Sequence, residues 1–285
     1  MAKSIPLVVI KNSADYGFNR FTKIETKSDK IPKSFVQFAF ENARKEIFQK
    51  RYGFRKDPYT GNPPEEASLI RSRRVFLKRL ELDNDNIWLR EHQRETVPAP
   101  RIMLSVYYSI CFLLDIIYDK KPIDRFWFLE TIARMPYFSY VAVLYMYESL
   151  GWWEIDGNLK RIHLTEELNE AQHLRIMESL GGDSLWWNRF LARHTAMVYY
   201  IVLVVLFMVS PRTAYMSSEL LERHAVDTYQ EFYEANKDIL KKMPLTQSAI
   251  DYLPTATTFY DVFKSIANDE NEHADTMKVV QTLKQ

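Results

Sequence analysis

The sequence has little cysteine, little glycine and almost no net charge, and each of these narrows what the protein can be. One cysteine, Cys111, excludes a disulfide bond within the 285-residue chain and fits a reduced compartment. Seven glycines are few for a turn-rich sheet protein, and the frequent Leu, Glu, Lys and Arg favour helices. A formal net charge of +1 gives no overall field to attract nucleic acid, so we expect no nucleic-acid partner.

Long apolar runs are also missing, since none reaches the roughly 20 residues that a membrane-spanning helix needs. The longest runs are residues 196–209, with fourteen apolar residues, and residues 102–114. Runs of this length suit either core helices or helices that lie in a membrane surface, and the runs alone leave both open. An aromatic belt would favour the membrane surface, and four tryptophans are candidates for it: Trp152, Trp153, Trp186 and Trp187.

The first residues, MAKSIPLVVIKNSADYGF, do not look like a targeting segment. Their apolar run is too short for a secretory signal, and they lack the Arg- and Ser-rich, acid-poor composition of a transit peptide. We therefore expect either a chain that needs no targeting or a mature form.

Apolar spacing predicts an all-α protein. Residues 1–99 are polar and rich in proline, with short helices expected at 34–50 and 66–82, and we interpret them as an N-terminal extension with an arm. Residues 100–285 are expected to form a helical bundle domain, because Gly and Pro punctuate almost continuous helical periodicity. The helices predicted there are residues 101–118, 122–149, 159–180, 185–209, 213–236 and 255–282.

Two Glu-x-x-His motifs, Glu170–His173 and Glu270–His273, fall on predicted helices. A spacing of three places both side chains on one helix face, one turn apart. Two such pairs, with one Glu from each of two further helices, bind the metal ions of di-iron four-helix bundles. Spacing alone is weak evidence, because two exposed pairs of helical side chains would give the same pattern.

The position of these residues strengthens the metal interpretation. Each motif interrupts an apolar helix face, and Glu130 and Glu222 are single acids on apolar faces of two other predicted helices. Burying an unpaired carboxylate is costly or forces it to be protonated, so four together need counter-charge. The obvious basic candidates are only Arg125, Arg134 and Arg223. Mixed carboxylate and imidazole ligands suit iron or manganese better than zinc.

Around these residues the sequence resembles the alternative oxidase family, and its plastid branch of plastoquinol terminal oxidases more than the mitochondrial branch. The resemblance covers roughly residues 100–283 and all four predicted ligand helices. The motifs that carry it are Leu129-Glu130-Thr131, Asn169-Glu170-Ala171-Gln172-His173, Glu222-Arg223-His224-Ala225 and Asp269-Glu270-Asn271-Glu272-His273.

The resemblance implies a ferritin-like di-iron four-helix bundle with two additional membrane-surface helices, and it implies roles for particular residues. Two Fe ions would be bound by Glu130, Glu170, His173, Glu222, Glu270 and His273. The quinol pocket would use Arg125, Leu129, His224, Ala225 and Thr228. Asn169 and Asp269 would orient the histidines. Tyr229 would be the family's redox-active tyrosine, although the residues alone favour a core tyrosine.

The implied activity is that of a membrane-bound quinol:oxygen oxidoreductase, which reduces O2 to water without pumping protons. The resemblance favours plastoquinol over ubiquinol, a homodimer, and a monotopic position on the cytoplasmic or stromal side of a membrane, the thylakoid above all. The basic residues between 71 and 79 would join the dimer interface or contact anionic headgroups. Three alternatives stay open: a ubiquinol oxidase, a di-iron monooxygenase or hydroxylase, and a non-enzymatic membrane-surface scaffold whose acids are solvated.

Overall fold

The computed structural model describes residues 34–48, 67–153 and 159–283, and every regular element in these ranges is a helix. The chain divides into two compact units, Met1–Lys50 and Arg51–Gln285, and the described part of the first contains helix α1, Phe35–Phe48. The helices of the second unit are α2 (Ala67–Leu77), α3 (Asn84–Gln93), α4 (Arg101–Ile117), α5 (Pro122–Ser149), α6 (Leu159–Ser179), α7 (Trp186–Val209), α8 (Pro211–Ala235), α9 (Lys237–Leu240), α10 (Gln247–Tyr252) and α11 (Phe259–Val280).

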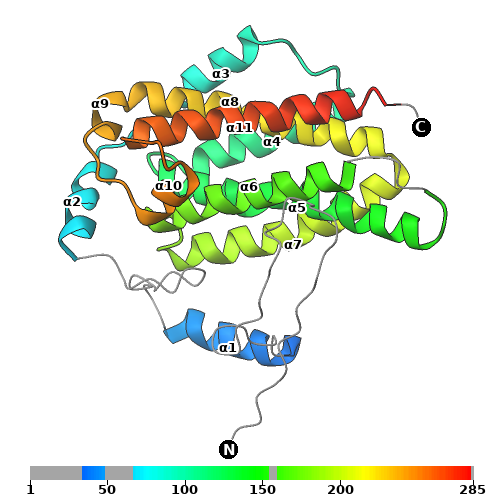
Figure 1. The fold of residues 1–285 in the computed structure, drawn as a ribbon, viewed down its shortest axis with the longest axis horizontal. Helices are drawn as coiled ribbons and strands as arrows, with labels where there is room; N and C mark the ends of the chain where they lie inside the picture. Colours follow the sequence, from blue (N-terminus) through cyan, green and yellow to red (C-terminus); the bar gives the residue numbers. More distant parts are fainter. Residues whose placement is uncertain (1–33, 49–66, 154–158, 284–285) are drawn as a thin grey trace, which may run out of the picture. The chain divides into compact units, whose positions relative to one another are not determined.

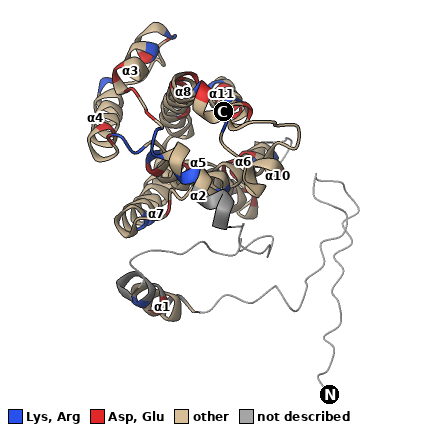
Figure 2. Ribbon diagram, turned by 90° about the vertical axis from the view of Figure 1, so that its left-hand side faces the viewer, with Lys and Arg blue, Asp and Glu red and all other residues tan. Residues whose placement is uncertain are grey.

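Helices α5, α6, α8 and α11 form a four-helix bundle (Figure 1). Helix α8 packs along α11 and α5 packs along α6, so that the two pairs face each other across a common core (Figure 2). Aromatic rings from three of these helices fill one end of the core. Phe126 stacks on Tyr229 with ring centroids 4.2 Å apart, and Phe232 lies edge-on to Phe126 at 4.9 Å.

Local sequence signals fix where the bundle helices begin. Helices α5 and α8 start with Pro122 and Pro211, because proline lacks the N–H that the first turn leaves unpaired. Helix α11 starts with a capping box, in which the Thr258 hydroxyl accepts from the Asp261 amide and the Asp261 carboxylate accepts from the Thr258 amide. These starts set which residues of each helix face the core.

Helices α4 and α7 flank the bundle on the same side (Figure 2) and keep one apolar face uncovered. Helix α7 is the one helix in the described part of the chain that is long and apolar enough to cross a membrane. On both helices the exposed side chains include large aliphatic and aromatic residues, among them Ile102, Val106, Phe112, Leu113, Ile116, Val198, Ile201, Val202, Val205 and Val209.

The predicted all-α class and the six long helices are confirmed, with starts that differ by up to four residues. Helix α8 begins two residues before the predicted start because Ser210 caps it, and α11 begins at Phe259 because Thr258 caps it. Helices α3, α9 and α10 were not predicted. The predicted arm and targeting character concern residues 1–33 and 49–66, which lie outside the described residues. The boundary at residue 100 stays a prediction.

Candidate metal centre

Six side chains from the four bundle helices converge in the core. They form two quartets in which one candidate ligand atom from each member lies within 4.8 Å of the others. Each quartet has its own terminal glutamate and histidine, and both contain Glu170 and Glu270. The quartets are Glu130, Glu170, His173 and Glu270, and Glu170, Glu222, Glu270 and His273. Two adjacent cations with two shared carboxylates would fit this arrangement.

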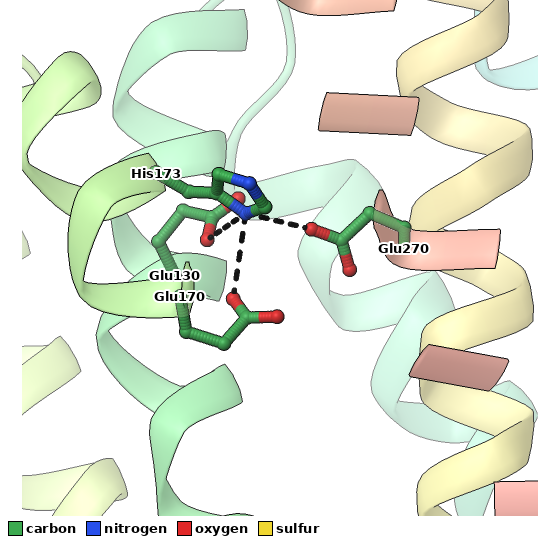
Figure 3. A group of neighbouring side chains, drawn as sticks. All are labelled: Glu130, Glu170, His173 and Glu270. Carbon is green, nitrogen blue, oxygen red and sulfur yellow. Dashed lines mark ion pairs between the residues drawn. The ribbon is translucent and has the colours of Figure 1, made fainter. Parts of the chain in front are cut away.

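Figure 3 shows the first quartet, with three carboxylates around one imidazole nitrogen. Nδ1 of His173 lies 3.1 Å from Glu270 Oε1, 3.7 Å from Glu130 Oε2 and 3.8 Å from Glu170 Oε2. A single ring nitrogen can form only one strong hydrogen bond. Three carboxylates directed at the same nitrogen therefore indicate a cation site between these groups.

The second quartet contains the other histidine, His273. Nδ1 of His273 lies 2.8 Å from Glu170 Oε1, the other oxygen of the carboxylate that approaches His173. Glu170 therefore directs one oxygen toward each histidine, as a bridging carboxylate does. The two imidazole centroids are 6.4 Å apart.

Five of the six residues have a buried oxygen or nitrogen atom without a hydrogen-bond partner, which is the direct test of whether the cluster suits a metal. All six residues are at most 5% exposed. The atoms without a hydrogen-bond partner are Glu130 Oε2, both oxygens of Glu170, Glu270 Oε1, and Nδ1 of His173 and His273. Buried polar atoms normally find partners, so a group of unsatisfied acceptors that face one another fits cations bound between them. The alternative in which the acids are solvated is wrong.

The charges within the cluster perturb one another strongly. Burial, reinforced by the charge of Glu170, raises the pKa of Glu130 and of Glu270, and it raises the pKa of Glu222 to about 7. Burial also disfavours charge on Glu170, but the nearby imidazoles of His173 and His273 outweigh it and lower the pKa of Glu170. Four carboxylates therefore cannot all ionise here without added positive charge.

The basic side chains that could have supplied this charge are paired elsewhere. Arg134 binds Glu167, and Arg223 binds Asp275 through Nη2 at 2.5 Å. Arg125 places Nη1 2.7 Å from Asp115 Oδ1. None of the three forms an ion pair with the clustered glutamates among the described residues, so counter-charge from arginine does not explain the cluster.

A tyrosine donates a hydrogen bond to the terminal glutamate of each quartet. The Tyr229 hydroxyl donates to Glu130 Oε1 in a very short contact, and the Tyr137 hydroxyl donates to Glu222 Oε1 at 2.7 Å. Burial and the neighbouring glutamates raise the pKa of both hydroxyls, so both keep their protons. From sequence Tyr137 counted only as a core residue, because an apolar stripe does not reveal what its hydroxyl contacts.

His173 is held from behind by an acid. Asp269 Oδ2 lies 3.1 Å from Nε2 of His173, and the same oxygen accepts from Asn169 Nδ2 at 3.0 Å and from the Tyr252 hydroxyl at 2.6 Å. The structure therefore brings Asn169 and Asp269 together beside the histidine. Tyr252 was missed, because it comes from the short helix α10 that the sequence pattern did not predict.

Three residues of the predicted quinol pocket form one buried group. Arg125 Nη2 lies 3.2 Å from Nε2 of His224, and the Thr228 hydroxyl donates to the His224 carbonyl at 2.7 Å. Leu129 and Ala225 are only partly buried, and Leu129 packs against the bundle core.

Helices α3 and α4 cover this group, and sequence reasoning missed their contribution. Asn84 and Asp115 accept from Arg125 Nη1 at 3.0 and 2.7 Å. Glu91 Oε2 lies 3.7 Å from Nδ1 of His224, and its other oxygen accepts from the Tyr107 hydroxyl at 2.8 Å. Although burial opposes it, hydrogen bonding to His224 and Tyr107 lowers the pKa of Glu91.

A second missed group contains His163 and Glu166, which precede Glu170 on α6, and Tyr215 of α8. His163 Nδ1 is 3.0 Å from Glu166 Oε2, and its Nε2 is 2.9 Å from the Tyr215 hydroxyl. His163 is fully buried and both of its ring nitrogens are satisfied. No motif in the sequence marks His163 and Glu166, and the geometry is that of a structural histidine rather than a ligand.

These features define a class: a helical-bundle protein with a buried carboxylate–histidine cluster shaped for two metal ions. Sequence comparison agrees, since the profile of the alternative oxidase family matches residues 91–282. Ubiquinol oxidase 4, chloroplastic/chromoplastic, of Arabidopsis thaliana is 43% identical over 196 residues, which cover 61% of this chain and 56% of that protein. Ubiquinol oxidase 1, mitochondrial, of Nicotiana tabacum is 28% identical over 193 residues, which cover 67% of this chain and 54% of that protein.

The chain belongs to the alternative oxidase family. It spans just over half the length of the curated relatives it matches.

Proposed function

We propose that this protein is a quinol:oxygen oxidoreductase that reduces O2 to water at a di-iron centre. The observation that carries the proposal is the pair of overlapping quartets, because Glu170 and Glu270 belong to both. Glu130, His173, Glu222 and His273 would complete the coordination of the two ions, one glutamate and one histidine at each. The names of the relatives, all ubiquinol oxidases, support a quinol as the reductant.

A pair of iron ions, when bound, would supply the redox chemistry that oxygen reduction needs. The chain's own residues would control protons and water around them. Tyr229 holds a proton against Glu130, and its ring is stacked on Phe126, which excludes water from this side. We assign Tyr229 as the redox-active tyrosine because it combines a buried hydroxyl with direct contact to a terminal ligand.

Quinol oxidation would take place at Arg125, His224 and Thr228, with Leu129 and Ala225 at the edge of the pocket. Arg125 is 1% exposed and Thr228 is fully buried, so a quinol that reaches them must displace side chains of α3 or α4. The Arg125 guanidinium would donate to a quinol oxygen, and His224, held between Arg125 and Glu91, would bind the same quinol.

The uncovered apolar faces of α4 and α7 support a position on one membrane leaflet. Ten or more large apolar side chains are exposed there, more than a soluble surface usually gathers in one patch. Trp152 and Trp186 are exposed as well, as residues of an aromatic belt would be. Helix α7 is long and apolar enough to span a membrane. The uncovered apolar face of α4 on the same side of the bundle supports an interfacial position for both helices.

The finer assignments rest on the family resemblance and on the chloroplast-type relative at 43% identity. They are plastoquinol as the reductant, the thylakoid as the membrane, a position on its cytoplasmic or stromal side, and a homodimer. Oxygen-uptake rates with short-chain analogues of plastoquinol and ubiquinol test the choice of plastoquinol. Light scattering on the detergent-solubilised protein tests the homodimer, which a monomer would contradict.

Oxygen uptake with a short-chain quinol tests the activity itself. Substituting Glu222→Ala removes a terminal ligand and is expected to abolish uptake, whereas Glu234→Ala, an exposed acid on the same helix, is expected to keep it. Full uptake by the Glu222→Ala variant would overturn the ligand assignment. Incorporation of an oxygen atom from O2 into an organic product would indicate a monooxygenase instead.

An iron count per chain tests the cofactor independently of turnover. We expect two Fe per chain after purification without chelator, and a large fall in melting temperature when the metal is removed, because stripping leaves four glutamates buried without counter-charge. An unchanged melting temperature would contradict the proposed centre.

A further inference from the structure

A basic pocket lies away from the metal cluster, where α2 meets the turn between α4 and α5 and the end of α6. Its volume is about 230 Å³. Four of its ten lining residues are cationic and one is acidic, Asp124. The cations are Arg74, Lys78, Lys120 and Lys121. Figure 2 shows Lys and Arg on the segment that leads from α4 into α5.

In the described part of the chain, no ion pair neutralises the lysines of this pocket. Lys78, Lys120 and Lys121 form no ion pair with any residue that the structure describes, whereas Lys160 and Lys278 each bind a glutamate. Lys121 instead places Nζ 5.3 Å from the centre of the Trp187 ring. Like charges around one pocket repel each other, so their free energy falls when an anion binds between them.

The backbone at the pocket also favours an anion. Helix α5 begins at Pro122, so the amides of Ile123 and Asp124 in its first turn and the positive end of the helix dipole lie at this pocket. Lys120 adopts a left-handed conformation with φ 55°, where glycine would be unstrained. A lysine in this position accepts backbone strain and adds a charge to the pocket.

We propose that this pocket binds a phosphate group. Phosphate chemistry fits a small site with several ammonium groups and one guanidinium, since lysine binds phosphate as a point charge and arginine binds it with paired N–H groups. A volume of 230 Å³ is below the usual range for drug-sized ligands and suits a headgroup or a free ion.

The position of the pocket favours the headgroup of an anionic phospholipid as the source of the phosphate. Lys120 and Lys121 follow directly after α4, and Trp187 lies in the first turn of α7, so the pocket borders the ends of both helices with uncovered apolar faces. This source rests on the proposed membrane position, whereas binding of free phosphate does not.

Asp124 is compatible with an anion. Burial raises its pKa to about 6, although Lys121 opposes the rise and Asp183 adds to it. Its carboxyl group therefore takes up a proton easily when a second negative charge enters, and Asp124→Asn removes the repulsion altogether.

The test uses full-length protein with its metal and compares four forms: wild type, Lys120→Gln/Lys121→Gln, Asp124→Asn, and the control Lys241→Gln/Lys242→Gln. The control removes the same charge from adjacent exposed lysines outside the pocket. One arm measures partition to phosphatidylcholine vesicles with and without phosphatidylglycerol. The other measures the shift in melting temperature with inorganic phosphate against chloride at equal ionic strength. Oxygen uptake in detergent monitors the metal centre separately.

We expect the Lys120/Lys121 variant to lose at least about tenfold in partition to the anionic vesicles, and the Asp124→Asn variant to gain. The control should lose far less. Loss in the vesicle arm alone supports a lipid headgroup, and loss in the phosphate arm alone supports a free phosphate. Equal behaviour of the Lys120/Lys121 variant and the wild type in both arms, or an equal loss in the control, overturns the proposal. If the phosphate proposal fails in this way while every variant keeps its oxygen uptake, the proposed oxidase function still stands.

Discussion

Asp269 Oδ2 lies 3.1 Å from Nε2 of His173, whereas the three glutamates of its quartet approach Nδ1, the other ring nitrogen. Hydrogen bonds from Asn169 and Tyr252 fix the carboxylate, so the ring can neither rotate nor change its tautomer freely. Although burial opposes charge, the Asp269 hydrogen bond is the largest of the contributions that raise the pKa of His173. The position of this ring therefore depends on an acid that is not itself in either quartet.

Replacing that acid is expected to loosen the metal rather than unfold the protein. Asp269→Asn should lower iron affinity by about ten- to a hundredfold, measured by competition with a chelator. Asp275→Asn on the same helix is the control, because Asp275 is exposed and binds Arg223 at the surface. Equal iron affinity in the two variants would show that Asp269 does not orient the histidine.

The two tyrosines on terminal glutamates provide a matched comparison. Tyr229→Phe and Tyr137→Phe each remove one buried hydroxyl that donates to a terminal glutamate. If Tyr229 is the redox-active residue, only Tyr229→Phe should lower oxygen uptake, by about a hundredfold, with two Fe retained. A similar loss in both variants would indicate that the hydroxyls only hold the carboxylates in place.

Asp124 predicts a pH-dependent change in stability. Its pKa is about 6 in the folded protein against an ordinary value of 3.8, so ionisation disfavours the folded state. The loss of folding stability caused by the ionised carboxylate is absent below about pH 4. It grows between about pH 4 and 6 and is complete at higher pH. Because the group is partly exposed and lies in the first turn of α5, we expect Asp124→Asn to stabilise by only about 1 kcal/mol at pH 8.

Denaturant unfolding of Asp124→Asn and the wild type at about pH 5 and pH 8 measures this difference. Asp119→Asn is the control, since Asp119 is an exposed acid five residues earlier. A gain in stability that is as large at pH 5 as at pH 8 would assign the effect to something other than the Asp124 charge.

Two ion pairs, one buried and one exposed, should differ in what they contribute to stability. Arg94 Nε lies 2.7 Å from Asp227, which is 5% exposed, while Lys278 binds an exposed glutamate, Glu95. Arg94→Gln leaves a buried acid without its partner and should cost about 2 kcal/mol in the free energy of unfolding. Lys278→Gln should leave the free energy of unfolding almost unchanged, because water screens this exposed pair. Equal costs would contradict a structural role for the α3 contact.

The long helices could be predicted because their apolar periodicity is strong and proline or glycine marks most ends. The short helices could not, because α9 and α10 hold only four and six residues and α3 buries just Ile87 and Glu91. A pattern that covers so few apolar positions does not stand out from a polar loop. Helix α3, which was not predicted, is nevertheless one of the two helices that cover Arg125 and His224.

The candidate site could be predicted as a set of residues but not as a geometry. Glu-x-x-His spacing and single acids on apolar faces identify the members of the cluster, because both features are local to one helix. Which glutamates are shared depends on how four helices pack, and no single helix contains that information. The same applies to Tyr137 and Tyr252, whose hydroxyl partners lie 85 and 17 residues away.

The two carboxylates common to both quartets also determine how the centre would be loaded. An ion bound in one quartet would hold Glu170 and Glu270 in place for the other, because both residues belong to both quartets. Loading one quartet would therefore prepare the other. Partially loaded molecules should be scarce during iron titration, so that binding follows a steep, cooperative curve with few single-iron species.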